Sequence, residues 1–313
     1  MGFTVGVDVG GTKIAGGVVD TSGKILDRIR RSTPSTDPDA IVQQIIEVVT
    51  ELRGSYDVDA VGVGSAGFVD ATRSTVLFAP NLAWRNLAVG DRVAAATGLP
   101  TVVENDANSA AWGEFRFGAA EDVDDMVCLT VGTGVGGGLV LDGVLYRGAH
   151  GIGGELGHLR LVPQGRRCGC GRQGCLEQYA SGNALERDAR AAAVQRPAAA
   201  ARLLDLAGGD VFALRGEMVT QAAREGDRLA TELLAGIGRW LGEALASLGA
   251  VLDPAVFVIG GGVSQAGELL LGPAEEAYRA NLTGGGHRPE AQLRVATLGV
   301  DAGIVGAADL ALR

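Results

Sequence analysis

The chain has very few lysines and no long apolar run. Only Lys13 and Lys24 are lysines among 313 residues, and the formal net charge is −10. The basic residues form neither a stripe nor a tail, so we expect no nucleic-acid and no membrane partner. The longest uncharged apolar stretch, Met126 to Leu141, is glycine-rich and shorter than the ~18 residues of a membrane span. The first residues lack the features of a signal peptide, so we expect a cytoplasmic protein.

The composition nevertheless permits a proper core. Apolar residues make up 47% of the sequence and charged residues 20%, which argues against disorder. At 313 residues, two domains of ordinary size are the natural expectation. Strand-like and helix-like segments alternate, which predicts an α/β fold. The clearest segments are helices over Asp39–Arg53, Asp106–Phe115 and Asp227–Leu252 and strands over Ala60–Val63, Thr101–Glu104 and Val256–Ile259.

The 50 glycines fall in short clusters rather than at a collagen-like period. The first cluster, Asp8-Val9-Gly10-Gly11-Thr12-Lys13, joins two expected strands. It is either a β-hairpin turn that needs glycine for positive φ, or a phosphate cradle. In a cradle, backbone N–H groups, Thr12 and Lys13 donate to phosphate oxygens, and Asp8 holds Mg²⁺ through water. A second cluster, Gly132 to Gly138, also follows an apolar strand and precedes another apolar strand that ends in Asp, Asp142 here and Asp20 in the first case. This likeness indicates a faint internal duplication.

Two common nucleotide-binding motifs are excluded. The spacing G-x-G-x-x-G begins at Gly62 and at Gly132, but each stretch continues as extended chain rather than helix. A dinucleotide site needs the helix N-terminus for the pyrophosphate. The P-loop pattern G-x-x-x-x-G-K-[ST] does not occur. We therefore expect neither a Rossmann nor a P-loop site.

Polar residues close one of the expected strands. Glu104-Asn105-Asp106-Ala107-Asn108 ends the strand and opens the next helix. Asn and Asp are favoured helix caps, which is the simpler interpretation. Ligands of open α/β sheets gather at the carboxyl ends of strands, so this segment is also a candidate site.

The sharpest constellation consists of His158, Cys168, Cys170 and Cys175. Three thiolates and an imidazole are a standard tetrahedral zinc set. Because protein fills all four positions, we expect a structural Zn²⁺ rather than a hydrolytic one. Free thiols are the alternative. Cys128 lies in an apolar strand and is expected in the core.

Two carboxylates flank this loop, Glu155 and Glu177. A single Glu is usually plain surface charge. Here a zinc ion would fix both carboxylates and the second nitrogen of His158 as a preorganised polar wall. Polyhydroxylated ligands suit such a wall, because a carboxylate accepts from two adjacent hydroxyls.

Together these segments resemble the ROK family (repressors, open reading frames and kinases), in particular its bacterial glucokinases. The resemblance extends over essentially the whole chain and includes Pro80-Asn81-Leu82-Ala83-Trp84. It implies an α/β, actin-like (ribonuclease H-like) ATPase fold, with two α/β domains, an active site in the cleft between them and a small zinc-binding loop. The expected domains are 1–117 plus 300–313, the latter a helix after Asp301, and 118–299 with the zinc loop at 158–177.

The resemblance also implies the reaction, which is transfer of the γ-phosphoryl group of ATP to the 6-hydroxyl of a hexose, with D-glucose as the leading substrate. Asp106 would be ionised at neutral pH and able to accept the hydroxyl proton. The implied sugar contacts are Asn105, Asp106, Glu155, His158 and Glu177. The implied contacts of ATP and its Mg²⁺ are Asp8, Gly10, Gly11, Thr12, Lys13, Gly132, Thr133, Gly134, Gly260, Gly261 and Gly262.

Several alternatives stay open. Fructose, mannose, N-acetylglucosamine and N-acetylmannosamine are other acceptors, because hexose selectivity depends on single hydroxyl contacts. Polyphosphate is another donor. The family's sugar-responsive repressors carry an N-terminal helix-turn-helix, for which little chain precedes Asp8. A non-enzymatic actin-like ATPase would lack the zinc loop. The resemblance further implies a homodimer or a homotetramer.

Overall fold

The computed structural model describes residues 2–313, which form two compact units. The first unit comprises the chain as far as Cys128, then Gly137–Gly154 and Ala296–Arg313. The second unit comprises Leu129–Gly136 and Glu155–Val295. Both units contain strands and helices, as the expected α/β class requires. The predicted domains, 1–117 plus 300–313 and 118–299, stay a prediction, because compactness alone does not define an independently folding domain.

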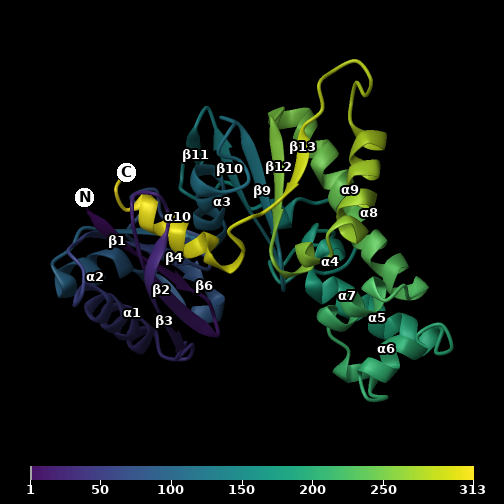
Figure 1. Cartoon of the computed structure of the whole chain (residues 1–313), viewed down its shortest axis with the longest axis horizontal. Helices are drawn as coiled ribbons and strands as arrows, with labels where there is room; N and C mark the ends of the chain where they lie inside the picture. Colours follow the sequence, from purple (N-terminus) through teal and green to yellow (C-terminus); the bar gives the residue numbers. More distant parts are fainter. Residues whose placement is uncertain (1) are drawn as a thin grey trace. The chain divides into compact units, whose positions relative to one another are not determined.

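A five-stranded sheet of order β3-β2-β1-β4-β8 is the centre of the first unit (Figure 1). β1, β2 and β3 are antiparallel neighbours, whereas β4 runs parallel to β1 and β8 parallel to β4. The strands are Phe3–Val9 (β1), Lys13–Val19 (β2), Ile25–Ser32 (β3), Val58–Ser65 (β4) and Thr101–Asn105 (β8). A small antiparallel sheet consists of Phe68–Val69 (β5), Val76–Ala79 (β6) and Trp84–Leu87 (β7). The strands predicted within β4 and β8 are confirmed.

Local sequence explains helix α1, which spans Pro38–Arg53. The Asp37 carboxylate accepts hydrogen bonds from two free N–H groups of the first turn, at 3.0 Å each, and Pro38 occupies a position that needs no N–H. The apolar stripe at helical spacing is buried, which confirms this helix: Ile41, Ile45, Val48, Val49 and Leu52. The other α-helices of the unit are Val89–Thr97 (α2), Asp106–Phe117 (α3) and Ala302–Leu310 (α10).

The last helix, α10, lies against β1, β4 and α3 (Figure 1, yellow). The backbones approach closely because glycines face the helix. A Cβ on Gly6 would lie 1.9 Å from the Ile304 carbonyl oxygen, and one on Gly62 would lie 1.8 Å from that of Ala307. The chain's end therefore packs onto its amino-terminal part, as predicted from the family resemblance.

The second sheet has the order β11-β10-β9-β12-β13, and the boundary between the units crosses β9 and β10. β10 and β11 are antiparallel, and β12 and β13 are parallel. The strands are Met126–Val131 (β9), Val135–Leu141 (β10), Val144–Tyr146 (β11), Val256–Gly260 (β12) and Gln292–Val295 (β13). In each sheet the central strand, β1 or β9, has the next two strands of the chain on one side and two later strands on the other. This shared order supports the duplication that the two glycine turns indicate.

The longest helix, α8, spans Arg228–Leu252 in the second unit and packs against α9, Glu268–Asn281. Asp227 caps it by accepting from the Ala230 N–H at 2.8 Å, and it ends at Asp253, whose φ is +46°. This confirms the long helix predicted from Asp227 to Leu252. The other α-helices of the unit are Glu177–Ala180 (α4), Gly182–Gln195 (α5), Ala201–Leu206 (α6) and Gly216–Arg224 (α7).

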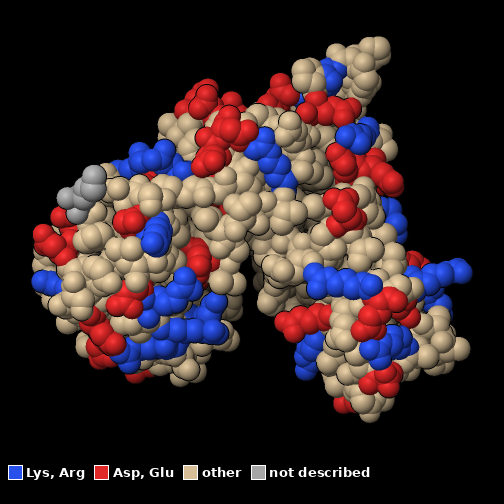
Figure 2. Space-filling model, viewed as in Figure 1, with Lys and Arg blue, Asp and Glu red and all other residues tan. Residues whose placement is uncertain are grey.

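Charged side chains of both signs are present on each unit in Figure 2. Several arginines of the first unit are paired with carboxylates, as in the ion pairs of Arg28 with Asp301 and of Arg31 with Glu51. Within residues 2–313, no helix has the length and apolar character that a bilayer span requires.

Candidate active site

Asp106 stands where β8 ends and α3 begins. Asn105 caps α3, since its Oδ1 accepts from the N–H groups of Ala107 and Asn108 at 2.9 and 3.0 Å. Its Nδ2 donates to the Gly67 carbonyl and to Asp106 Oδ1, both at 3.1 Å. Asp106 Oδ1 also accepts from the Ala107 N–H at 2.9 Å. Within the described part of the chain all these bonds fall on Oδ1, so Oδ2 is left to face a reacting group.

The residue before this pair, Glu104, is a buried carboxylate with 1% of its surface exposed. Its Oε1 accepts from the Asn105 N–H at 2.9 Å and from the Asn108 side chain at 3.0 Å. Its Oε2 lies 2.7 Å from Arg147 Nε and 3.6 Å from Arg73 Nε, although neither N–H is aligned for a hydrogen bond. A buried carboxylate is tolerated when it is paired in this way. Glu104 therefore fixes the strand end on which Asn105 stands.

The first glycine turn, between β1 and β2, is closed by a bond from the Gly10 N–H to the Lys13 carbonyl at 2.9 Å. Thr33 holds it from β3's side, because its hydroxyl donates to the Gly10 carbonyl at 2.7 Å. Neither Gly10 nor Gly11 has a positive φ, and a Cβ on either would stay at least 3.4 Å from the nearest described atom. The turn does join the antiparallel strands β1 and β2, as the hairpin interpretation expects, but backbone geometry does not require glycine at either position. The missing side chains leave space beside the N–H groups, which favours a phosphate cradle.

The Pro80-Asn81-Leu82-Ala83-Trp84 segment lies beside this turn. A Cβ on Gly11 would lie 3.4 Å from the Asn81 Cβ. Trp84 is fully buried, and its Nε1 donates to the Pro38 carbonyl at 3.2 Å. Trp84 therefore anchors this segment in the core, and Asn81 lies next to the turn.

Asp8 lies in β1, two residues before the turn, and interacts electrostatically with Asp106 and Lys13. Burial and, next, the negative charge of Asp106 raise the pKa of Asp8 to about 6, while Lys13 acts in the opposite direction. Burial also raises the pKa of Asp106, against hydrogen bonds from Ala107 and Asn105 that lower it. A raised pKa makes a carboxylate a better proton acceptor, and a pair of carboxylates attracts a divalent cation. The turn, Asp8 and Asp106 therefore belong to one site.

The second glycine turn borders a cavity of about 960 Å³ in the second unit. Gly132 and Gly262 line it, neither has a positive φ, and a Cβ on either would meet no described atom within 4 Å. Gly261 differs, because its φ is +85° and a Cβ would lie 2.5 Å from the Val131 carbonyl oxygen. The volume suits a nucleoside. The cavity thus unites two predicted nucleotide segments, with Thr133 also at its wall and Gly260 at the end of β12.

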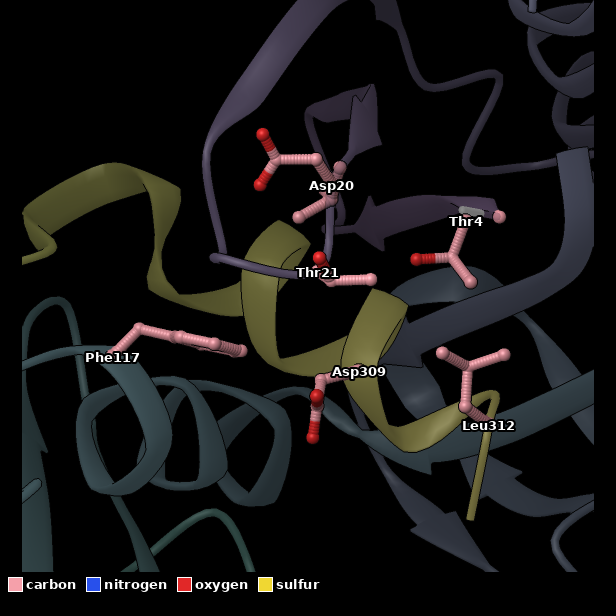
Figure 3. A pocket seen from close by; sticks show the side chains of 8 residues that line it. Thr4, Asp20, Thr21, Phe117, Asp309 and Leu312 are labelled. Carbon is pink, nitrogen blue, oxygen red and sulfur yellow. The ribbon is translucent and has the colours of Figure 1, made fainter. Parts of the chain in front are cut away.

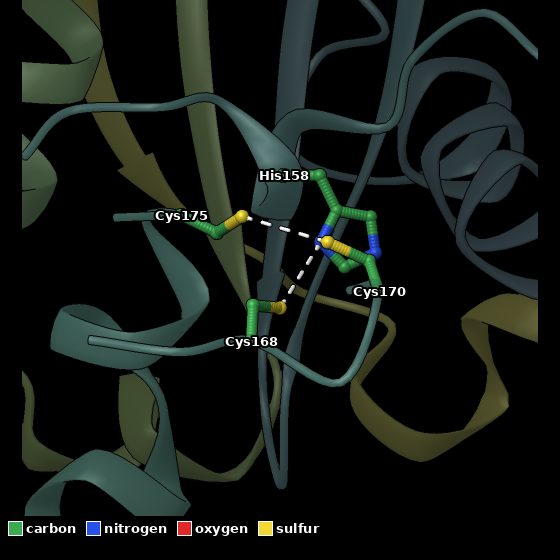
Figure 4. A group of neighbouring side chains, drawn as sticks. All are labelled: His158, Cys168, Cys170 and Cys175. Atoms are coloured by element: carbon green, nitrogen blue, oxygen red, sulfur yellow. Dashed lines mark hydrogen bonds between the residues drawn. The ribbon is translucent and has the colours of Figure 1, made fainter. Parts of the chain in front are cut away.

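The predicted zinc ligands converge, as Figure 4 shows. The ligand atoms of His158, Cys168, Cys170 and Cys175 all lie within 4.8 Å of one another. His158 Nδ1 is 3.7 Å from Cys168 Sγ, and the sulfurs of Cys170 and Cys175 are 3.7 Å apart. Ligands at zinc bond lengths of about 2.0–2.3 Å in a tetrahedron are separated by roughly 3.5–3.8 Å. The donor set and its spacing therefore fit Zn²⁺. Cys128 is buried in β9, as predicted.

The two carboxylates predicted beside the zinc loop are close to its ligands. Glu155 Oε2 is 3.9 Å from His158 Nε2, the ring nitrogen on the side away from Cys168. Glu177 opens α4, and its Oε1 is 3.7 Å from Cys168 Sγ. A metal on Nδ1 would leave Nε2 for another partner. The loop thus gathers one imidazole nitrogen and two carboxylates, the groups expected of a polar wall for hydroxyls.

A second hollow, in the first unit, is too small for a substrate. It lies near α10 and has a volume of about 20 Å³, enough for about one water molecule. Figure 3 shows the Thr4, Phe117 and Asp309 side chains that line it. Asp309 is already engaged there, since it accepts from Trp112 Nε1 at 2.7 Å.

The shared strand order of the two sheets, each with a glycine turn, is that of an actin-like ATPase, and residues 4–313 match the ROK family. The chain belongs to this family. It is 48% identical over 311 residues to the glucokinase of Streptomyces coelicolor, an alignment that covers 99% of this chain and 98% of the relative. It is 36% identical over 310 residues to the N-acetylmannosamine kinase of Salmonella typhi, with 98% of each chain covered.

A solved structure is equally similar along the whole chain. The ROK-family glucokinase of Streptomyces griseus, in complex with glucose and AMPPNP, superimposes with a TM-score of 0.91 at 51% identity. The match covers 99% of each chain.

Sequence reasoning missed two parts of the site. The cavity is lined largely by α5 and α7, with Asn183, Glu186, Glu217, Thr220, Gln221 and Arg224 among its polar residues. These helices lie in or beside an alanine-rich stretch without a motif. The pairing of Glu104 with Arg147 was also missed. The pairing could have been suspected because Glu104 is a charged residue in an otherwise apolar strand, and such a residue needs a partner elsewhere in the chain.

Proposed function

We propose that this protein is an ATP-dependent glucokinase, which transfers the γ-phosphoryl group of ATP to the 6-hydroxyl of D-glucose and yields glucose 6-phosphate and ADP. The choice of glucose is supported by similarity to glucokinases of two Streptomyces species along nearly the full chain. The observation that carries the chemistry is Asp106, a buried carboxylate whose Oδ1 accepts from Asn105 and Ala107 and whose negative charge acts on Asp8.

Asp106 is the proposed general base. Its Oδ2 accepts the proton of the sugar hydroxyl as the hydroxyl oxygen attacks the γ-phosphorus, and the bond to the leaving β-phosphate oxygen breaks. A base of this kind contributes about 10²–10⁴-fold to the rate. Asn105 orients it, since its amide donates to Oδ1 and turns Oδ2 outward. The rest of the acceleration comes from positioning and charge stabilisation.

The donor phosphates are proposed to bind the first glycine turn, where the Gly11 N–H, the Thr12 hydroxyl and the Lys13 ammonium are the proposed donors. Gly10 leaves space for the phosphates, while its own N–H closes the turn by donating to the Lys13 carbonyl. Mg²⁺, when bound, neutralises charge on the phosphates, and Asp8 is placed to hold it through its water shell. The nucleoside is proposed to occupy the cavity of the second unit. Its proposed contacts are Gly132, Thr133, Gly134, Gly260, Gly261 and Gly262.

The sugar is proposed to bind Asn105 and Asp106 together with Glu155, His158 and Glu177. A structural Zn²⁺ held by His158, Cys168, Cys170 and Cys175 would order the loop that carries the last three. Metal analysis of the purified protein checks this, and we expect about one zinc per chain. A zinc-free protein with full glucose affinity would contradict the role of the loop.

The reaction is tested by measuring ADP release with ATP against a panel of sugars. We expect kcat/KM to be highest for glucose, above fructose, mannose, N-acetylglucosamine and N-acetylmannosamine. N-acetylmannosamine belongs in the panel because a relative at 36% identity is named as a kinase of that sugar. A higher value for any other sugar would reassign the substrate, and no sugar-dependent release would overturn the kinase proposal.

Two further proposals follow from the family resemblance. The protein is expected to work in the cytoplasm and to form a homodimer or homotetramer. Light scattering after gel filtration distinguishes these states from the 31.9 kDa monomer.

A further inference from the structure

The turn that precedes β10 has few bonds of its own. Its internal bond runs from the Gly132 N–H to the Gly134 carbonyl at 3.0 Å. The next two bonds come from the chain that follows the zinc loop. Gly182 donates its N–H to the Gly132 carbonyl at 2.7 Å, and Asn183 donates to the Thr133 carbonyl at 3.3 Å. The conformation of this turn therefore depends on the segment at its side.

The residue that precedes the zinc loop touches the turn at Val135. Gly157, in the short 3₁₀ helix Leu156–His158, packs so closely that a Cβ on it would lie 1.9 Å from the Val135 carbonyl oxygen. At the other end of the same residue, Glu177 Oε2 accepts from the Val135 N–H at 3.3 Å. The residue beside the first zinc ligand and the first residue of α4 thus hold Val135 between them.

Glu177 also explains the glycine at position 134. A Cβ there would lie 2.3 Å from Glu177 Oε2, although the φ of Gly134 is not positive. Its other oxygen, Oε1, is 3.7 Å from Cys168 Sγ. One partly buried carboxylate therefore contacts both the turn and the metal-ligand set.

We propose that Glu177 is a positioning residue for the nucleotide, in addition to its proposed contact with the sugar. By accepting from the Val135 N–H it holds the Gly132–Val135 turn open for ATP and connects that turn to the zinc loop. The inference rests on the proposed function, because it assumes that ATP binds this turn. A neutral acceptor suffices for the bond, so the role needs an oxygen at this place but not a negative charge.

The test is the affinity for AMPPNP with Mg²⁺, measured by isothermal titration calorimetry without sugar. We expect Glu177→Ala to weaken binding about five- to twentyfold, since the Val135 N–H loses its partner. Glu177→Gln keeps a carbonyl oxygen and should bind within about twofold of the wild type. Both variants should have a raised KM for glucose, because the sugar contact is proposed to need the charge. This split separates positioning of the turn from recognition of the sugar.

Gly134→Ala is an independent variant. It keeps the Glu177 side chain, but the added methyl group pushes the carboxylate away from the Val135 N–H. We expect a similar loss of AMPPNP affinity, and no further loss when it is combined with Glu177→Ala, because both changes break one interaction. Zinc content and the unfolding temperature are measured for each variant, and both should stay near wild type.

Three results overturn the inference: AMPPNP affinity of Glu177→Ala within twofold of wild type, additive losses in the double variant, or loss of zinc that accounts for the weaker binding. Failure of the proposed function is a different result. It would be wild-type protein that does not phosphorylate glucose, whatever the affinities of the variants.

Discussion

Asp106 is the single residue on which turnover is expected to depend most. Asp106→Asn should lower kcat by at least about 10²-fold, because an amide does not accept the hydroxyl proton. The amide oxygen still accepts from the Asn105 side chain and the Ala107 N–H, so the fold should be unchanged. Steady-state kinetics measure the loss, with zinc content and unfolding temperature as controls. Activity within tenfold of wild type would contradict the assignment of the base.

Asp8 is expected to limit the stability of the ligand-free protein. Its pKa is raised from an ordinary value of 3.8 to about 6, so the folded state binds the proton more tightly than the unfolded state. The stabilisation from that proton is fully present below about pH 4 and is lost as the pH rises through about 6. Above that, the ionised side chain costs on the order of 1–3 kcal/mol, a range that allows for its partial exposure.

Asp8→Asn should therefore raise the free energy of unfolding at pH 7–8 without Mg²⁺ or nucleotide, even though it removes a proposed Mg²⁺ contact. Urea unfolding of both proteins between pH 4 and pH 8 measures this. The difference should shrink as the pH falls and disappear near pH 4. A variant that is less stable than wild type at every pH would show that burial does not strain this carboxylate.

The sequence predicted those parts of the candidate site whose residues lie close together along the chain. His158 and the three cysteines lie within 18 residues of one another, so spacing alone indicated a metal set. Asn105 and Asp106 are adjacent, and the capping geometry follows from their types. The pairing of Glu104 with Arg147 joins residues far apart in the sequence, and no local pattern indicates which arginine a buried carboxylate meets.

At the scale of elements, the contact between α8 and α9 depends on a glycine. A Cβ on Gly242 would lie 2.3 Å from the Ala274 carbonyl oxygen, a backbone atom that cannot rotate away. Gly242→Ala should therefore reduce the free energy of unfolding by about 1–3 kcal/mol, despite the higher helix propensity of alanine.

The matched control is Gly236→Ala on the same helix. There a Cβ would approach only the end of the Arg239 side chain, at 3.8 Å. This variant should be as stable as wild type or gain up to about 1 kcal/mol. Denaturant unfolding of both variants is the measurement, and equal effects would show that α8 and α9 are not held at this spacing.

Elements with a strong period or cap were predictable, and those without were not. α1 and α8 have an apolar stripe, an aspartate cap and a clear end, and both were predicted nearly to their bounds. The region of α5, α6 and α7 is rich in alanine, which is tolerated equally on a buried and an exposed face. The helices that line the cavity do bury one face, such as Val219, Ala222 and Ala223 of α7, but no motif in them indicates a ligand, so they could not be assigned a role.

For the whole molecule, the sequence indicated a duplication, although only faintly. Two glycine turns in similar surroundings predicted two related α/β parts, and the two sheets have the same strand order. The cavity could not be predicted, because it needs the 3₁₀ helix Gly262–Ala266, α5, α7 and the second turn to meet. These segments are separated by long stretches of chain, and only tertiary packing brings them together.

The charge of the whole molecule bears on the phosphoryl donor. The net charge is −10, and the cavity is lined by Arg215 and Arg224 against Glu186, Glu217 and Glu225. Both arginines are already engaged, since Arg215 donates to the Phe212 and Leu214 carbonyls and Arg224 to that of Gln265. A polyphosphate chain carries a charge on every phosphate and would meet carboxylates with few cations to offset them, whereas a nucleoside is neutral.

Polyphosphate should therefore be a poor donor. With glucose as acceptor and no nucleotide present, we expect glucose 6-phosphate to form at roughly one hundredth of the rate with ATP or less, because like charges brought together cost several kcal/mol. Addition of ATP to the same mixture should restore the full rate, which controls for inhibition by the polymer. A rate with polyphosphate above about a tenth of that with ATP would mean that the donor binds without the cavity, along a path where its charge is balanced.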